Sequence, residues 1–240
     1  MKTGPGSEHL VVGLGEVGKA IKEALERYDG YNVFAFDKKW GAPNRKFSFI
    51  HICFPYNKKF VKLMKILRKY YLRKNGVIIV HSTVLVGTCE LAGAVHSPIR
   101  GMHPHLKKGI LIFTKYFGGP SSGRAAKIFK RLGIKTKVVA NSSTSELLKL
   151  CDTLQYGVNI RLEKEIFALC KSHGVDFDVV YTDANKTYNK GYIKLSMTHV
   201  TRPVLKEISG KIGGRCIIQN ANMTNTKIAK ELIKFNDSLS

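Results

Sequence analysis

A glycine-rich turn near the start of the chain has the spacing of a dinucleotide-binding site. The hexapeptide Gly13-Leu14-Gly15-Glu16-Val17-Gly18 is a G-x-G-x-x-G motif that follows the apolar run from His9 to Val12. In this setting the first glycine permits a tight turn, the second lets the backbone approach a pyrophosphate, and the third allows close packing of a helix on the strand. N–H groups at the start of that helix then face the phosphates. All six residues are therefore predicted to bind a dinucleotide.

An acidic residue stands where such a site would bind the adenosine ribose. The apolar run from Tyr31 to Phe36 ends at Asp37. A carboxylate at this point accepts hydrogen bonds from the ribose hydroxyls and repels a 2′-phosphate, so it favours NAD over NADP. Lys38 and Lys39 follow directly, and a neighbouring cation could accommodate the phosphate, which leaves NADP as the alternative. We predict NAD.

The elements that position these residues alternate between strand and helix. We expect strands at 9–12, 31–36, 46–55, 76–83, 94–99, 115–120 and 134–140, with helices at 17–25, 57–74, 87–94 and 122–133. This order predicts an α/β fold with a Rossmann-type, doubly wound parallel sheet and helices on both faces. The ligand crevice of such a sheet lies at the carboxyl ends of the strands. Lys38, Phe54, Pro55, Ser82 and Thr83 fall there and complete the predicted cofactor site.

The second half of the chain is predicted to be a smaller α-helical domain, 141–240, after a Rossmann domain of 1–140. A capping box, Ser143 with Glu146, opens a long helix over 143–173. Its apolar stripe is too large to stay in water, so its own domain or a second copy of the chain must cover it. We therefore expect a homodimer through this helix. Further helical pieces are expected at 177–192, 198–208 and 224–239.

The net charge of the chain indicates which class of partner it attracts. Forty Lys and Arg against seventeen Asp and Glu give a formal net charge of +23, which concentrates anions near the surface. Nucleic acid, a phosphorylated substrate or an anionic cofactor would each be attracted by this positive charge. The basic residues are scattered, and they lack the adjacent aromatic platforms of a single-strand groove. We expect a small anionic substrate and treat nucleic-acid binding as a lesser alternative.

The five cysteines and the apolar runs indicate the cellular compartment in which the protein is expected. Cys53, Cys89, Cys151, Cys170 and Cys216 form no C-x-x-C pair and have no metal-ligand spacing with histidine, so we predict no metal. An odd, dispersed set without a signal peptide is typical of a reducing compartment. No apolar run is long enough to span a bilayer. The sequence thus favours a cytoplasmic protein without membrane association.

Several segments together resemble the UDP-glucose/GDP-mannose dehydrogenase family. "VVGLGEVG" and "FAFDKK" are similar to its cofactor motif, "HICFP" to its third strand, and "HSTVLVGT" to its S-T-V-x-x-G-T segment. "SELLKLCDTLQYGVNIRLEKEIFALCKSHGVD" resembles its central helix, and "GGRC" resembles its G-G-x-C. The resemblance implies an NAD-dependent enzyme that oxidises a nucleotide-sugar alcohol in two hydride transfers. Members also carry a third, nucleotide-sugar-binding domain, and we expect this chain to be a truncated or divergent member that lacks it.

The resemblance also implies roles for three residues. Thr83 would contact cofactor and substrate, and Lys149 would stabilise a developing oxyanion. Cys216 would attack an aldehyde to form a thiohemiacetal, because a nucleophile must add before a second hydride can leave. The alternative for Cys216 is a small buried side chain beside a turn, and the alternative for Lys149 is a solvated helix face.

Three positions depart from the family pattern. Thr153 stands at the family's asparagine, Asn220 at its aspartate and Ile99 at its glutamate. Loss of the carboxylates removes groups that would position water and accept protons. Whether a second oxidation occurs is therefore left open.

A histidine pair after the predicted fifth strand suggests a different chemistry. "GMHPHL" contains His103 and His105, either of which can act as an acid or a base near neutral pH, and Arg100 could pair with a carboxylate or phosphate. The His-Pro step is similar to that of prephenate dehydrogenases, in which the histidine lies near the substrate. An ordinary solvated turn is the alternative.

These patterns favour an NAD-dependent dehydrogenase that transfers hydride between an alcohol group of a small anionic, sugar-nucleotide-like substrate and nicotinamide. The predicted catalytic residues are Cys216, Lys149, Thr83 and His103. The alternatives are a non-catalytic NAD-binding regulatory protein and a prephenate-dehydrogenase-like enzyme that uses His103.

Overall fold

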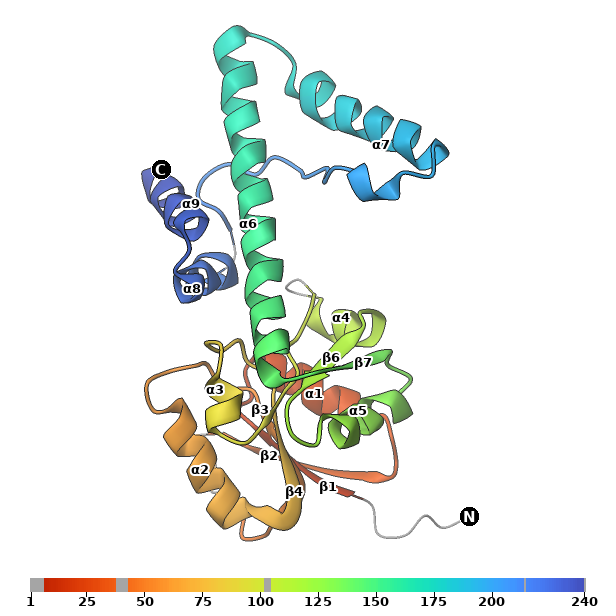
Figure 1. Cartoon of the computed structure of the whole chain (residues 1–240), viewed down its shortest axis with the longest axis vertical. Coiled ribbons are helices and arrows are strands. Elements are labelled where there is room, and N and C mark those ends of the chain that lie inside the picture. The colour runs from red at the N-terminus through yellow and green to blue at the C-terminus, as the bar shows by residue number, and fades with distance from the viewer. Residues whose placement is uncertain (1–6, 38–42, 102–104, 214, 240) are drawn as a thin grey trace. The chain divides into compact units, whose positions relative to one another are not determined.

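Figure 1 shows the chain as a computed structural model, which describes residues 7–37, 43–101, 105–213 and 215–239. The chain forms two compact units, Met1–Lys149 and Leu150–Ser240. The division between them falls within helix α6 (Ser142–His173). The functional boundary predicted after residue 140 stays a prediction. Lys38 and His103, two of the predicted site residues, lie outside the described residues.

The first unit is built on a seven-stranded sheet with the order β2-β1-β3-β4-β5-β6-β7. The strands are β1 (Ser7–Val12), β2 (Tyr31–Phe36), β3 (Phe47–Ile52), β4 (Leu72–Val80), β5 (Val95–His96), β6 (Lys115–Gly118) and β7 (Thr136–Val139). The first five strands are parallel to one another. The strand order reverses at β1, because β2 lies on one side of it and β3 on the other. This arrangement confirms the predicted Rossmann-type α/β fold.

The sequence led us to expect a fully parallel sheet, but the observed sheet contains one antiparallel pair. β6 pairs with β5 in the antiparallel sense through His96 and Gly118, and β7 is parallel to β6. The connection from β5 to β6 contains one helix, α4 (Leu106–Ile112), which we did not predict. Its seven residues span only about 10 Å. A helix this short does not carry the chain back to the edge where the parallel strands begin. β6 therefore starts near the end of β5 and runs in the opposite direction.

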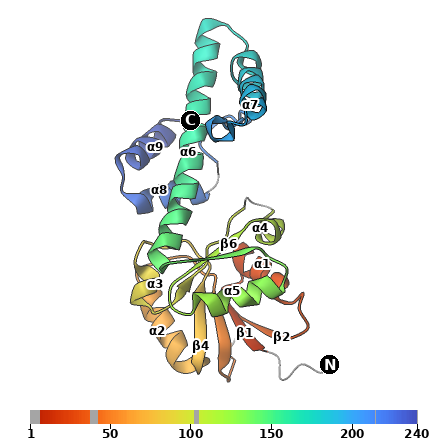
Figure 2. The ribbon, with the colours of Figure 1, turned by 45° about the vertical axis from the view of Figure 1, so that its right-hand side comes forward.

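Helices cover both faces of the sheet (Figures 1 and 2). α1 (Glu16–Leu25), α4 and α5 (Ser122–Arg131) share one apolar core with alternate strand residues such as Val11. α2 (Phe60–Tyr71) and α3 (Thr88–Leu91) share the other core with the intervening residues, such as Leu10 and Val12. Successive side chains of a strand point to opposite faces. The near-continuous apolar strands are thus explained by burial on both sides.

The second unit is helical, as predicted. It contains most of α6, a π-helical turn η1 (Asp178–Asp183), α7 (Ala184–Lys194), a 3₁₀ turn η2 (Thr198–Val200), α8 (Arg215–Thr224) and α9 (Lys227–Ser238). α8 and α9 pack a small core against α6, centred on Ile217, Ala221 and Leu232. Gly157 of α6 makes this packing possible, because a Cβ there would lie 2.6 Å from Ile217 and 2.7 Å from Leu232.

Three local predictions were wrong. The expected helical piece at 198–208 is only the turn η2 followed by irregular chain, since Pro203 removes a backbone donor and clashes with the preceding turn. The expected helix over 57–74 is shorter, because the chain passes directly from α2 into β4 at Leu72. The capping box does not form either. Asn141 Oδ1 instead accepts from the N–H of Thr144 at 2.9 Å, and Glu146 binds elsewhere.

Candidate dinucleotide-binding site

The glycine-rich turn joins β1 to α1 at the point where the strand order reverses. Gly13 has φ +89°, a left-handed conformation that side chains disfavour, and its N–H donates to the Phe36 carbonyl at 2.9 Å. A Cβ on Gly13 would lie 2.9 Å from the Phe54 nitrogen. The turn therefore needs glycine both for its dihedral angle and for its approach to the end of β3.

The other two glycines of the motif have different surroundings. A Cβ on Gly18 would lie 1.8 Å from the Gly13 carbonyl oxygen, so Gly18 lets α1 pack on the turn. A Cβ on Gly15 would meet no described atom within 4 Å beyond its chain neighbours. Gly15 immediately precedes α1, whose first N–H groups have no partner within the helix. The open space thus lies where an anion would be stabilised by a helix start.

Asp37 has a structural role that the sequence did not reveal. Its Oδ2 accepts a hydrogen bond from the Leu14 N–H at 2.9 Å. The carboxylate at the end of β2 thereby holds the glycine-rich turn against the sheet. Its predicted contact with the adenosine ribose stays a prediction.

The other predicted cofactor residues gather at the same edge of the sheet. The Cys53 N–H donates to the Val12 carbonyl at 2.9 Å, which joins the ends of β3 and β1. The Ser82 hydroxyl donates to the Phe54 carbonyl at 2.7 Å, which joins the segments after β4 and β3. The carboxyl ends of three neighbouring strands thus bring Gly13, Phe54 and Ser82 together, with Thr83 next along the chain. Crevices at this edge are where open α/β sheets bind ligands.

A buried carboxylate that was assigned to a helix cap anchors the segment after Thr83. Glu146 is fully buried and accepts from the N–H groups of Gly87 at 2.7 Å and Cys89 at 2.8 Å. Gly87, at φ +89°, precedes α3, so the carboxylate neutralises the start of that short helix. The sequence pattern S-x-x-E could not distinguish this long-range bond from a local one.

The residues given catalytic roles by the family resemblance are distributed over both units. Thr83 is half-buried in the first unit, and Lys149 is its last residue. Cys216 lies in the first turn of α8 in the second unit and is exposed, not buried beside a turn. Within that unit, the Asn220 amide donates to the Thr153 hydroxyl at 3.1 Å. The two positions at which the family carries asparagine and aspartate are therefore neighbours here, in a neutral pair.

The most unusual feature of the first unit was not anticipated at all. Three buried histidines from neighbouring strands form one hydrogen-bonded row. His9 Nδ1 lies 3.0 Å from His51 Nε2, and His51 Nδ1 lies 3.0 Å from His81 Nε2. The Ser7 hydroxyl lies 2.8 Å from His9 Nε2 at one end, and His81 Nδ1 lies 2.9 Å from the Ser97 carbonyl at the other. We call Ser7, His9, His51 and His81 the histidine row.

Burial keeps these rings neutral near pH 7. Loss of hydration lowers the pKa of His9 to about 4 and holds the pKa values of His51 and His81 well below the ordinary value. A fourth histidine, His96, bonds Ser145 outside the row, and burial lowers its pKa to about 3. A charged form of any of these rings would lack compensating hydration.

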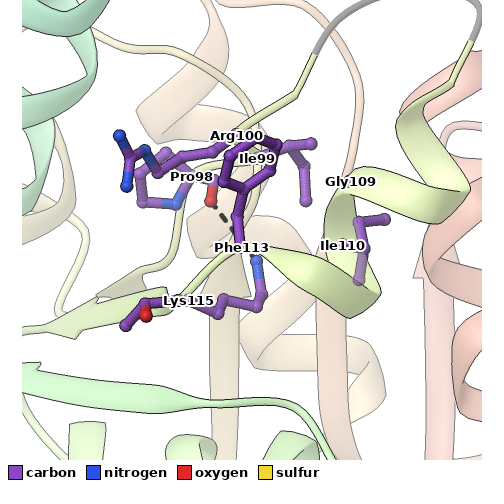
Figure 3. Close-up of a pocket in the computed structure, with 8 residues that line it drawn as sticks. Pro98, Ile99, Arg100, Gly109, Ile110, Phe113 and Lys115 are labelled. Atoms are coloured by element: carbon purple, nitrogen blue, oxygen red, sulfur yellow. Dashed lines mark hydrogen bonds between the residues drawn. The ribbon is translucent and has the colours of Figure 1, made fainter. Parts of the chain in front are cut away.

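A buried lysine ends the same region. Lys115 Nζ donates to the Ser97 carbonyl at 2.9 Å. It donates more weakly to the Pro98 carbonyl at 3.4 Å, the bond drawn in Figure 3. Burial lowers the pKa of Lys115 to about 7. The side chain borders a cavity of about 10 Å³, room for one water molecule. The lining residues are Pro98, Ile99, Arg100, Gly109, Ile110, Phe113, Thr114 and Lys115.

The described ranges contain neither a metal-binding cluster nor a membrane-spanning helix. No group of three or more His, Cys, Asp or Glu side chains there could hold a metal ion. No described helix is both long enough and apolar enough to cross a membrane.

Comparisons with known proteins rest on structure. No protein-family model matches the chain, and no curated protein matches it by sequence. UDP-D-ManNAc dehydrogenase from Pyrococcus horikoshii is similar in structure, with a TM-score of 0.74 and 17% identity over 96% of this chain and 68% of that one. UDP-glucose dehydrogenase from Pyrobaculum islandicum has a TM-score of 0.70 and 14% identity, covering 99% and 69%. Mycobacterium tuberculosis 3-hydroxyisobutyrate dehydrogenase has a TM-score of 0.69 and 14% identity, covering 95% and 92%. At these identities the similarity establishes the fold.

Proposed function

We propose that the protein is an NAD-dependent oxidoreductase that transfers hydride between an alcohol carbon of a small anionic substrate and nicotinamide. The observation that carries this proposal is the open space at Gly15, which lies at the start of α1 and at the reversal of strand order. Protein atoms occupy the space beside Gly13 and Gly18, where a Cβ would collide with them. Of the three motif glycines, only Gly15 therefore leaves room for a ligand among the described residues. Similar structures from three dehydrogenases support the proposal.

The residues at this edge fit the parts of the cofactor in order. The N–H groups from Gly13 to Gly18 would bind the pyrophosphate, and Asp37 the ribose hydroxyls. Phe54, Pro55, Ser82 and Thr83 would lie toward the nicotinamide. The cofactor would supply the hydride acceptor, and the protein would hold it against the edge of the sheet.

The proposed substrate is anionic and sugar-like. The net charge of +23 favours anions. Two of the similar structures are UDP-sugar dehydrogenases, and a third acts on 3-hydroxyisobutyrate. Lys149 would stabilise an oxyanion and Cys216 would act as nucleophile, if a second oxidation takes place. The neutral Thr153–Asn220 pair offers no carboxylate to accept protons in that second step.

A second copy of the chain is the partner proposed for α6. Three leucines of this helix, Leu147, Leu162 and Leu169, are at least half exposed, at 50%, 54% and 59%. Apolar side chains gathered on one long helix are more stable when another surface covers them. We propose a homodimer through residues 143–173.

The Thr153–Asn220 pair also favours a second candidate, an NAD-binding protein without catalysis. A dehydrogenase that had lost its carboxylates could keep the cofactor site as a regulatory module. This candidate predicts cofactor binding and no turnover.

The proposal is tested by cofactor binding and by turnover. NADH binding is measured by fluorescence titration for the wild type, Gly15→Ala and Gly123→Ala. Both glycines face open space, but Gly123 lies in α5. We expect Gly15→Ala to weaken binding at least tenfold and Gly123→Ala to leave it unchanged. Equal affinity in all three proteins, or no NADH binding, would refute the site.

Reduction of NAD with any member of a panel of nucleotide sugars and hydroxy acids would exclude the non-catalytic candidate.

A further inference from the structure

The segment from Ser82 to Cys89, which contains Thr83, is held at its far end by the first turn of α6. It connects the end of β4 to α3. Glu146 Oε2 accepts from the Gly87 N–H at 2.7 Å, and Glu146 Oε1 accepts from the Cys89 N–H at 2.8 Å. Figures 1 and 2 show α3 beside the first turn of α6. The two oxygens of one carboxylate thus fix this end of the segment.

The near end of the segment reaches the same turn of α6 through a buried histidine of β5. His96 Nδ1 lies 3.0 Å from the Ser145 hydroxyl oxygen, and His96 Nε2 lies 3.3 Å from the Ser82 carbonyl oxygen. His96, Ser145 and Glu146 are all fully buried. Loss of a buried hydrogen bond leaves a polar group that water cannot reach, so these contacts hold both ends in place. We call Ser145, Glu146 and His96 the Thr83 bracket.

Lys149 follows the bracket on the same helix, three residues after Glu146. Burial is the main cause of the low pKa of His96, about 3, and the nearby charges of Lys115 and Lys149 lower it further. The Lys149 amine is therefore close enough to His96 to act on it electrostatically. The bracket thus joins Lys149 and the segment that carries Thr83 into one part of the first unit.

The strand order decides which half of a dinucleotide this segment would meet. Asp37 follows β2, on one side of β1, and Thr83 follows β4, on the other side. A dinucleotide binds across the point where the strand order reverses, with its pyrophosphate at the first glycine-rich turn. Because the adenosine ribose is proposed to bind at Asp37, the nicotinamide half extends over β3 toward Thr83.

We propose that the Thr83 bracket positions the nicotinamide half of the cofactor site. Its three residues are positioning residues, because they act through the Thr83 segment and not by contact with the cofactor. The adenosine half does not depend on the bracket, since the Asp37 carboxylate itself holds the glycine-rich turn through the Leu14 N–H. This inference rests on the proposed function, whose cofactor site it extends.

Two ligands separate the two halves of the site. ADP-ribose contains the adenosine, the pyrophosphate and the second ribose without nicotinamide, whereas NADH contains all four parts. Calorimetric titration at one salt concentration measures both affinities for the wild type, Glu146→Gln and Ser145→Ala. An amide nitrogen cannot accept a hydrogen bond, so Glu146→Gln leaves one backbone N–H without its acceptor. We expect both variants to bind NADH at least fivefold more weakly and to bind ADP-ribose within twofold of the wild type.

Matched controls lie on the same two elements. Glu90→Gln changes an exposed carboxylate of α3, and Ser143→Ala removes a hydroxyl from the same turn of α6 as Ser145. Both controls should keep the affinities for NADH and ADP-ribose within twofold of the wild type. A general loss of structure would weaken both ligands together, so the ratio of the two affinities isolates the effect on the nicotinamide half.

Amide hydrogen exchange tests the bracket without any ligand. The N–H groups of Gly87 and Cys89 should exchange slowly in the wild type, and Glu146→Gln should speed the exchange of at least one of them tenfold. Glu90→Gln should leave both rates unchanged. Exchange at both positions that is as slow in Glu146→Gln as in the wild type overturns the bracket.

The outcomes distinguish this inference from the proposed function. If the wild type binds NADH and both bracket variants bind it equally well, the bracket is wrong and the cofactor site stands. The same conclusion follows if both variants lose affinity for NADH and ADP-ribose to the same extent. A wild type that binds neither ligand refutes the proposed function, and the bracket with it.

Discussion

The amide of Asn220 donates a hydrogen bond to the hydroxyl of Thr153, and this bond connects α8 to α6 within the second unit. Asn220 is buried, with 4% of its surface exposed. Replacement by alanine would remove this donor from the half-buried Thr153 hydroxyl.

We therefore predict that Asn220→Ala lowers the free energy of unfolding of the second unit by about 1 to 2 kcal/mol. Urea unfolding followed by circular dichroism measures the change. The control is Asn222→Ala, because Asn222 is exposed and its amide donates within α8, to the Ile218 carbonyl. Equal stabilities for the two variants would contradict the prediction.

Glu146→Ala should destabilise the first unit more strongly. The carboxylate accepts two backbone N–H groups, those of Gly87 and Cys89, and both would lose a charged acceptor. We expect a loss of about 3 kcal/mol or more. Glu146→Gln should cost less, since one amide oxygen still accepts. Thermal unfolding measures both, and Glu90→Gln at an exposed position of α3 should have no effect.

Gly18→Ala should disrupt the turn through contact rather than through any ligand. The new Cβ would lie 1.8 Å from the Gly13 carbonyl oxygen, which is backbone and has little room to move. We expect a loss of about 3 kcal/mol in the free energy of unfolding. Gly123→Ala adds the same atom to a helix with open space around it and should stabilise by about 0.5 kcal/mol. A Gly18→Ala protein as stable as the wild type would show that the turn can shift.

Lys115 should make stability depend on pH in the alkaline range. The native amine loses its proton near pH 7, while the unfolded amine keeps its proton up to about pH 10.4. Unfolding in this window takes up a proton, so the free energy of unfolding rises with pH, by about 1.4 kcal/mol per pH unit. Below pH 7 the contribution of Lys115 is constant.

Lys115→Met should remove that slope between pH 7.5 and 9.5, measured by urea unfolding at several pH values. Lys137→Met, at an exposed position of the neighbouring strand β7, should keep it. If both variants retain the slope, the native amine of Lys115 is charged in this range.

The strands and the glycine-rich turn were predictable because each is encoded locally. Apolar runs that end at Gly13, at Phe54 or at Ser82 define buried strands, and the spacing of three glycines defines the turn. The bond of Glu146 to Gly87 was not predictable, since the two residues are 59 positions apart. The local S-x-x-E pattern instead predicted that the Glu146 carboxylate binds the nearby backbone N–H groups at the start of its own helix.

The histidine row was missed for a related reason. His9, His51 and His81 are separated by 42 and 30 residues, and each looks like an isolated polar residue in an apolar strand. Only the register of β1, β3 and β4 brings them into line. Helix α8 was missed because the glycines before Arg215 indicate a turn and do not show that a helix starts there.

The five cysteines fall into two groups that differ in their access to reagents. Cys53 and Cys89 in the first unit and Cys170 in the second are buried, and burial raises the pKa of Cys53 to about 12. Cys151 and Cys216 in the second unit are exposed. A maleimide dye added to the folded protein would therefore mark only the helical unit, so the native chain already carries two attachment points for a fluorescent reporter on α6 and α8, without any engineered thiol.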